Sequence, residues 1–457
     1  MRRLSSVCTV LVLLCLAAVQ SAAAAPSSPP TGPIRLGYCG GDDWEPAFAV
    51  QGSYVYDVIT HYVGDTTCDP AAGNPQAIYI QVSTDGGRTF GTPHAVWNAP
   101  VNGISYPEQA DPAIAVDAFG NVYVTFLGLG VNGGHSDIIA ARSSNHGASF
   151  ASATQVNSKD CKNCDHEKIV VSGGNIYVAY SQAQYHFIAI SRDQGATWTQ
   201  ATVDTTDVVG FAEAGVVDSA GNVYFAWADC QSSNCTGVPA ADYRVSKTLP
   251  GTLTTTFTNV ATGVQGPDCP FSSCGFAFFG NQDSLGIDAA GNLYLAWQQG
   301  QSSTTRKSPP IVNLSRSTDG GRTWTFVGRA DDKNASGCAS SACYALFPTV
   351  LGGAANTVYL AWMDDRNGSP IDHKNGWNVW LRTSTTGGTT WTAPSQRMSA
   401  YDPSQTQSQP SGFLFPYGDY FGLAMNSCGS PMLTWGEGHS WVGGASAPGH
   451  IEFRTLC

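Results

Sequence analysis

Acidic side chains recur along the sequence, each time just ahead of a short apolar segment. Acidic residues are otherwise scarce, because only 12% of the 457 residues are charged. Carboxylates held close together repel one another, which raises the pKa of some of them and lets one act as a proton donor. The groups are Asp43-Trp44-Glu45, Glu108-Gln109-Ala110-Asp111, Asp165-His166-Glu167-Lys168, Glu213, Asn281-Gln282-Asp283 and Tyr417-Gly418-Asp419-Tyr420.

The elements that position these groups belong to an internal repeat. The front half of each copy is an apolar segment, a turn that often contains Gly-Asn, and a second apolar segment. Gly and Asn tolerate the positive φ of tight turns, and the flanking residues are mostly strand formers, so each copy predicts a β-hairpin. The best copies span residues 113–126, 215–227 and 285–297, and looser ones span 47–59, 169–180, 349–362 and 422–435.

The back half of the repeat is a third predicted strand that runs into Ser-x-Asp-x-Gly-x-Thr-Trp or a variant of it. Five copies carry this turn, at residues 83–90, 143–150, 191–198, 317–324 and 384–391. The chain ends after the third strand of the last copy, so residues 34–38 are expected to supply the missing fourth strand and close the ring. We therefore predict an all-β fold, a single β-propeller of seven four-stranded antiparallel blades, with six blades as the alternative.

The repeated turn resembles that of the Asp-box (BNR-repeat) superfamily of sialidase-like β-propellers, which includes sialidases, other propeller glycosidases and some lectins. The resemblance covers nearly the whole chain after residue 25. It implies that Asp85, Asp193 and Asp319 are structural residues of turns on the face opposite the active site. It also implies that the first strand of each blade lines a central channel, so the acidic groups gather at the mouth of that channel.

The sequence departs from the sialidases themselves. Those enzymes clamp the substrate carboxylate with three arginines, whose guanidinium groups match it bidentately. The family's Arg-Ile-Pro segment is absent here, the nearest text being Ile34-Arg35-Leu36, and only Arg366 is expected on the functional face. The sialidase catalytic residues are therefore not transferred to this chain one by one.

The favoured hypothesis is a secreted sialidase-like glycoside hydrolase that acts on an extracellular glycan or polysaccharide through channel-mouth carboxylates. A polysaccharide lyase, with His166 or Tyr420 as base, and a non-catalytic carbohydrate- or protein-binding propeller are the alternatives. The predicted catalytic residues are Glu167 and Asp283, with Asp111 and Glu213 as alternates, together with Asp419 and Tyr420. The predicted substrate-binding residues are Trp44, Glu45, His166, Lys168, Asp365 and Arg366.

The N-terminal 25 residues have a basic start, an apolar run and a small-residue end, which together predict a secretory signal peptide. Residues 26–457 then form the propeller domain of an extracellular protein. No later segment is long and apolar enough to span a membrane. The formal net charge of −12 disfavours nucleic acid as a partner. We expect a monomer.

Cysteine usage fits export as well. Two of the 14 cysteines lie in the predicted signal segment, so 14 − 2 = 12 remain, an even number that predicts disulfides. Cys161-x-x-Cys164 followed by His166 could suggest zinc, but export favours a disulfide there, and no metal or other cofactor is expected. The predicted pairs are Cys161–Cys164, Cys230–Cys235, Cys269–Cys274, Cys338–Cys343, Cys39–Cys68 and Cys428–Cys457.

Overall fold

The computed structural model describes most of the chain after residue 31. The described residues are 32–38, 42–62, 76–131, 135–158, 164–182, 185–205, 209–231, 239–267, 282–302, 308–332, 343–367, 373, 376–400, 420–437 and 449–457. The predicted signal peptide and Asp419 lie outside these ranges. In the described part of the chain, no helix is long and apolar enough to cross a membrane.

The described residues form 28 strands in six sheets. One sheet holds β10 (Cys164–Ser172), β11 (Asn175–Gln182), β12 (Tyr185–Ser191) and β13 (Thr199–Asp204). The next holds β14 (Val209–Val217), β15 (Val223–Cys230), β16 (Ala241–Thr248) and β17 (Thr255–Gly263). A third holds β18 (Asp283–Ile287), β19 (Leu293–Gly300), β20 (Pro310–Ser317) and β21 (Thr325–Arg329). A fourth holds β22 (Ala345–Gly352), β23 (Val358–Asp364), β24 (Asn378–Ser384) and β25 (Gln396–Arg397). Each of these sheets has four antiparallel strands in chain order.

The other two sheets hold the N-terminal strands. An eight-stranded sheet contains β2 (Asp42–Gln51), β3 (Tyr54–Tyr62), β4 (Gln76–Ser83), β5 (His94–Ala95), β6 (Glu108–Val116), β7 (Val122–Val131), β8 (His135–Ser143) and β9 (Ser152–Gln155). Its two halves are joined by a single parallel pairing, between Gln76 and Glu108. The last sheet has the order β1 (Ile34–Leu36), β28 (His450–Thr455), β27 (Pro431–Glu437) and β26 (Phe421–Met425).

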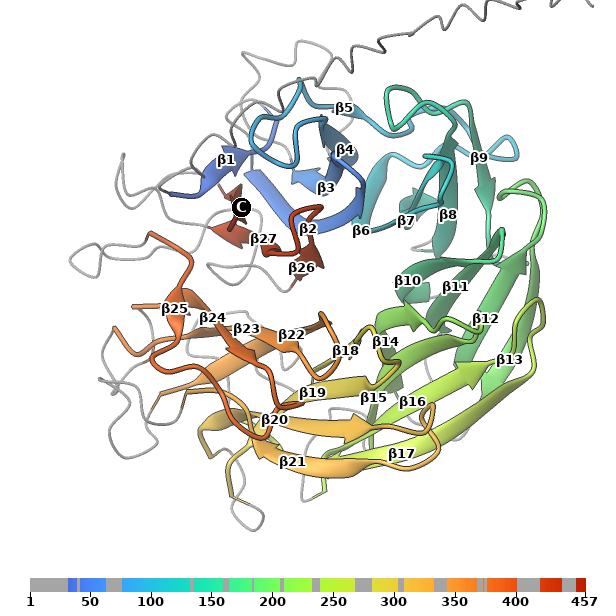
Figure 1. The fold of residues 1–457 in the computed structure, drawn as a ribbon. Coiled ribbons are helices and arrows are strands. Elements are labelled where there is room, and N and C mark those ends of the chain that lie inside the picture. Colours follow the sequence, from blue (N-terminus) through green and yellow to red (C-terminus); the bar gives the residue numbers. More distant parts are fainter. Residues whose placement is uncertain are drawn as a thin grey trace, which may run out of the picture.

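The sheets stand around a central axis, and the ring is closed (Figure 1). Strands β2, β6, β10, β14, β18, β22 and β26 each contact the next one, and β26 returns to contact β2. The N-terminal β1 pairs antiparallel with β28, so the prediction that residues 34–38 supply the missing strand is confirmed, with the strand itself limited to Ile34–Leu36. The molecule is thus an all-β propeller of four-stranded antiparallel blades.

The first hairpin of the best repeats is fixed by an aspartate. Asp117 Oδ1 accepts hydrogen bonds from the backbone N–H groups of Phe119 and Asn121, both at 2.9 Å, and Asp117 Oδ2 accepts one from the Asn121 side chain. Gly120 has φ 82°, and a Cβ there would collide with His146. Gly therefore supplies the positive φ, while Asn supplies a hydrogen bond. Asp218 and Asp288 make the equivalent bonds in their own turns.

The turns after the third strands are fixed in the predicted way. Asp85 Oδ1 accepts from the backbone N–H groups of Arg88 and Thr89 at 3.0 Å, Asp85 Oδ2 accepts from the Thr89 hydroxyl at 2.7 Å, and Ser83 Oγ accepts from Gly87 N at 2.9 Å. Such side-chain acceptors satisfy backbone groups that the tight turn leaves without partners. Corresponding bonds involve Asn145, Asp193, Asp319 and Thr386.

The core consists of apolar clusters between neighbouring sheets. Between the sheets of β10–β13 and β14–β17, for example, Tyr177 and Ile188 pack with Phe225 and Trp227, all fully buried. Removing side chains of this size from water stabilises the fold by about 1.5–3 kcal/mol each. Because most of the clusters join neighbouring sheets, the packing holds the first strands around the axis.

Candidate functional site

A cavity of about 260 Å³ lies on the central axis, lined by residues of all seven strands of the inner ring. Most of the residues that line it are apolar, such as Phe48, Ile114 and Leu423. The polar lining residues are concentrated on β10, β14 and β18 and just before β18 and β26. They are Lys168, Glu213, Gln282, Asp283, Ser284, Thr349 and Tyr420.

The inner strands bulge at one recurring place. Five of the seven shift register against their neighbour, between Trp44 and Ala47, Ala110 and Ala113, Asp165 and Lys168, Ala212 and Ala214, and Leu346 and Thr349. Four non-glycine residues in these bulges have left-handed backbones: Glu45 (φ 57°), Asp111 (φ 56°), His166 (φ 54°) and Phe347 (φ 52°). Such conformations cost roughly 1–3 kcal/mol each. Bulges redirect side chains, so this recurrence sets the directions of the predicted site residues.

Asp283 begins β18 and lines the cavity, and it is 5% exposed. Among the described residues, neither of its carboxyl oxygens has a hydrogen-bond partner. Burial raises the pKa of Asp283 well above its ordinary value, and the nearby charges of Glu213 and Asp229 raise it further. Burial therefore favours the protonated form of this carboxyl group, which lines the cavity.

Glu213 lies in the bulge of β14 and lines the same cavity. His166 Nδ1 is 3.7 Å from Glu213 Oε1, an ion-pair distance, and the imidazole packs 4.2 Å from the Phe211 ring. Burial acts to lower the pKa of His166, but the charges of Asp165 and Glu213 outweigh it and raise that pKa. The two side chains thus form a coupled polar pair beside the cavity.

Glu167 follows His166 on β10 and is 1% exposed. Neither of its carboxyl oxygens has a partner, and burial raises its pKa well above the ordinary value. It resembles Asp283 in both respects. Glu167 is not among the residues that line the cavity, whereas its neighbour Lys168 is.

Lys168 and Tyr420 meet at the mouth of this polar region. The Lys168 ammonium group lies 4.7 Å from the centre of the Tyr420 ring, within the range of a cation–π contact. Both residues line the cavity. The structure therefore brings together five predicted site residues, which are His166, Lys168, Glu213, Asp283 and Tyr420.

Three other predicted site residues, Trp44, Glu45 and Asp111, lie in the first two repeats, where they are buried or hydrogen-bonded to neighbouring protein groups. Glu45 accepts hydrogen bonds from the Tyr62 hydroxyl at 2.9 Å and from the backbone N–H of Asp111 at 3.1 Å. Trp44 is fully buried, so its indole ring has no exposed face for stacking a sugar. These residues hold the bulges of β2 and β6 together.

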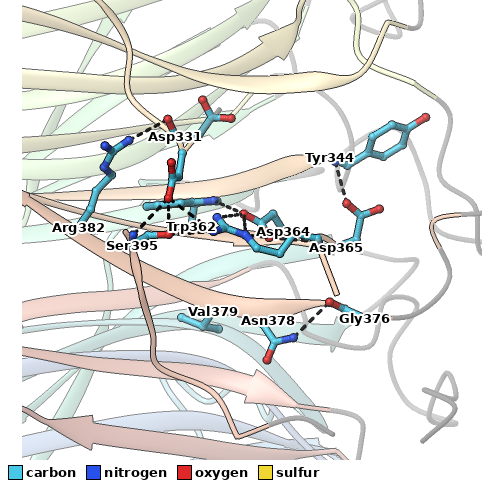
Figure 2. Close-up of polar contacts among 12 residues, drawn as sticks. Asp331, Tyr344, Trp362, Asp364, Asp365, Gly376, Asn378, Val379, Arg382 and Ser395 are labelled. Carbon is cyan, nitrogen blue, oxygen red and sulfur yellow. Dashed lines mark hydrogen bonds and ion pairs between the residues drawn. The ribbon is translucent and has the colours of Figure 1, made fainter. Parts of the chain in front are cut away.

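Asp365 and Arg366, just after β23 ends at Asp364, are also engaged with protein groups. Figure 2 shows Asp365 next to Tyr344. Asp365 accepts from Tyr344 N at 2.9 Å and pairs with His373. Arg366 Nε donates to Asp364 Oδ1 at 2.8 Å, Arg366 Nη1 donates to Ser395 Oγ at 2.9 Å, and the guanidinium group lies 3.8 Å from the Trp380 ring centre. These contacts bury Arg366. They also occupy the guanidinium N–H groups that were expected to bind the substrate.

One buried polar network was missed in the sequence. His186 Nε2 is 2.7 Å from Asp229 Oδ1, and Arg244 Nη1 donates to Asp229 Oδ2 at 3.0 Å. Asp229 in turn raises the pKa of Asp283. The available signal was Asp229 on the strongly apolar strand β15, where a charge is buried only if it is paired.

Comparison with known proteins gives matches among solved structures alone. No protein-family model matches the sequence, and no curated protein does. The structure is similar to a protein of unknown function from Dyadobacter fermentans (10% identity, 93% of this chain and 98% of that one, TM-score 0.49). It is also similar to a sialidase from Trypanosoma rangeli (9%, 77% and 57%, 0.45) and to an ulvan lyase of a new polysaccharide lyase family (13%, 77% and 81%, 0.46).

At these scores the likeness carries no argument about activity. The structure is also similar to an intramolecular trans-sialidase from Ruminococcus gnavus (14% identity, 92% of this chain and 96% of that one, TM-score 0.45). The propeller fold itself rests on the sheets and ring contacts of this chain.

Proposed function

We propose that this protein is a secreted glycoside hydrolase of sialidase-like fold that cleaves an extracellular glycan at the polar end of the central cavity. The observation that carries the proposal is the buried, unpartnered carboxyl group of Asp283 on the cavity wall beside Glu213. Two carboxyl groups in different protonation states are what glycoside hydrolysis requires.

In the proposed reaction Asp283 donates its proton to the glycosidic oxygen, and the bond between that oxygen and the anomeric carbon breaks. Glu213 acts on the anomeric carbon, either by accepting a proton from the attacking water or by forming the bond itself. His166 orients Glu213 through the 3.7 Å contact. Lys168 and Tyr420 offer a cation and a ring face to the sugar. Glu167 is the alternative acid.

We further propose that the propeller has seven blades. The eight-stranded sheet counts as two blades, β2–β5 and β6–β9, because only one parallel pairing joins its halves. The Ser-x-Asp turns are proposed to be Asp-boxes, on the strength of their hydrogen bonds.

Export to an extracellular compartment is proposed as well, together with a monomeric state. The Cys428–Cys457 disulfide supports export, because disulfides persist in oxidising compartments. It is one of the six pairs expected from the sequence. Cys164, Cys230 and Cys343 also form disulfides, and the partners expected for them lie outside the described residues, as do Cys39–Cys68 and Cys269–Cys274.

A panel of neutral and acidic glycans tests the proposal, with released sugars measured by chromatography. We expect the wild-type protein to cleave at least one glycan and Glu213→Gln to reduce its turnover about 10²- to 10⁴-fold. Gln396→Glu, an exposed amide–acid exchange on the outer strand β25, is the matched control and should leave turnover unchanged. Retention of a glycan without cleavage would favour a binding protein, and an unsaturated sugar product would favour a lyase.

A further inference from the structure

A second polar cluster lies at the seam where the ring closes, and none of its residues is assigned to catalysis. Glu437 ends β27, and His450 and Glu452 lie two residues apart on β28. The strand register places Glu437 directly opposite His450. Since alternate residues of a strand face the same way, all three side chains lie on one face of the sheet.

The three side chains converge. One potential ligand atom from each lies within 4.8 Å of the others, and His450 Nε2 is 2.9 Å from Glu452 Oε1. All three residues are buried, with Glu437 at 0% exposure. A group of two carboxylates and one imidazole is common on a protein surface but unusual in its interior.

The compensating charge that the described residues offer this cluster is His450, which contacts Glu452 and carries a charge only when protonated. Glu437 Oε1 and His450 Nδ1 have no hydrogen-bond partner, and Glu437 Oε2 has only the indole N–H of Trp435, at 3.3 Å. In the described part of the chain, no Lys or Arg forms an ion pair with Glu437 or Glu452. Burying carboxylates without a partner is costly, and a cation placed among the three side chains would remove that cost.

We propose that Glu437, His450 and Glu452 bind a divalent zinc ion. One imidazole nitrogen and two carboxylate oxygens are zinc ligands, whereas calcium and magnesium favour oxygen ligands alone. Three protein ligands leave one position of a tetrahedral site for water.

The position of the site gives it a structural role. Gly449, just before His450, donates to Asp42 Oδ1 at 2.6 Å and accepts from Asp43 N at 2.9 Å, so this end of β28 is tied to β2. The same strand pairs with the N-terminal β1. A zinc ion joining β27 to β28 would therefore stabilise the seam between the two ends of the chain.

Zinc titration of the full-length protein, stripped with EDTA beforehand, tests the proposal by calorimetry and thermal unfolding. We expect one zinc ion per chain and a rise of several degrees in the unfolding midpoint, because a ligand that binds only the native state stabilises it. Glu437→Gln and His450→Gln should each weaken binding about 100-fold or more. His61→Gln is the matched control, since His61 has a similar buried contact to Asp43, at 2.7 Å, without a third ligand.

Glu437→Gln is the decisive variant, because it removes an unpartnered buried carboxylate and should leave the zinc-free protein at least as stable as before. Co²⁺ gives a second measurement, a visible absorption band that should appear in the wild type and His61→Gln and be absent in Glu437→Gln. The proposal is overturned if zinc does not bind stoichiometrically, if its effect persists in Glu437→Gln, or if calcium or magnesium raises the midpoint and zinc does not.

Discussion

The pKa values of the aspartates at the two ends of the blades are shifted in opposite directions. In the turns after the third strands, the backbone N–H and hydroxyl of Thr323 lower the pKa of Asp319 to about 2, and similar bonds lower that of Asp193. At the cavity, burial raises the pKa of Asp283 well above its ordinary value, and its oxygens have no partner. The difference lies in burial at the cavity and in the supply of hydrogen-bond donors at the turn, since the ionisable group is the same.

Asp283→Asn should give the largest effect on function. Loss of the proposed acid should reduce turnover about 10³-fold, with the unfolding midpoint unchanged or higher, because a buried carboxyl without partners contributes no stability. Steady-state assays and thermal scans measure the two quantities. Asp319→Asn, the same exchange at a turn, should leave turnover unchanged. Equal losses of turnover in both variants would contradict the proposal that Asp283 at the cavity is catalytic while Asp319 at the turn is structural.

The pH profile should carry the signature of Asp283. A general acid works only when protonated, so kcat/KM should fall as the pH rises through the raised pKa of Asp283. The alkaline limb should therefore lie above the range of an ordinary carboxyl group and should shift in Asp283→Glu. Rate measurements across the pH range test this. A limb that stays in place in Asp283→Glu would assign it to another group, such as His166.

The buried carboxyl of Asp57 extends the comparison to stability. Burial raises the pKa of Asp57 to about 8, although the hydrogen bond from the Thr434 hydroxyl opposes the change. Because the folded protein holds this proton more tightly than the unfolded chain, the stabilisation is complete below the unfolded pKa, near 4, and is lost as the pH rises to about 8. The unfolding midpoint should fall by several degrees over that range, and Asp57→Asn should flatten the decline. An unchanged slope in Asp57→Asn would refute this assignment.

Local features of the fold could be predicted from the sequence, because they depend on neighbouring residues. The hairpins and the Asp85-type turns belong to this class, whereas the strand at Ile34–Leu36 was predicted from the need to close the ring. The aspartate that fixes the first hairpin was overlooked, although Asp-x-x-Gly-Asn is visible at Asp117 and at Asp288.

The state of each site residue could not be predicted, because its partners come from other strands. Glu45 looks like a free carboxylate in the sequence, yet the register of β3 places the Tyr62 hydroxyl beside it. Arg366 likewise donates a hydrogen bond to Ser395, which lies 29 residues further along the chain. Asp283 has no such partner, and only the assembled ring reveals that difference.

The smallest effect is expected at the turn itself. Asp319→Ala removes the acceptor for the backbone N–H groups of Arg322 and Thr323 and for the Thr323 hydroxyl, so the unfolding midpoint should fall by a few degrees. Asp319→Asn should cost less, because Asn145 occupies the same place in another repeat and its Oδ1 accepts from Ser149 N at 3.0 Å. Thermal scans of the two variants separate these outcomes. If the two variants lose the same stability, the negative charge of Asp319 contributes more than the geometry of its hydrogen-bond acceptors. The low pKa of Asp319 would then reflect stabilisation of the ionised carboxylate rather than the shaping of the turn.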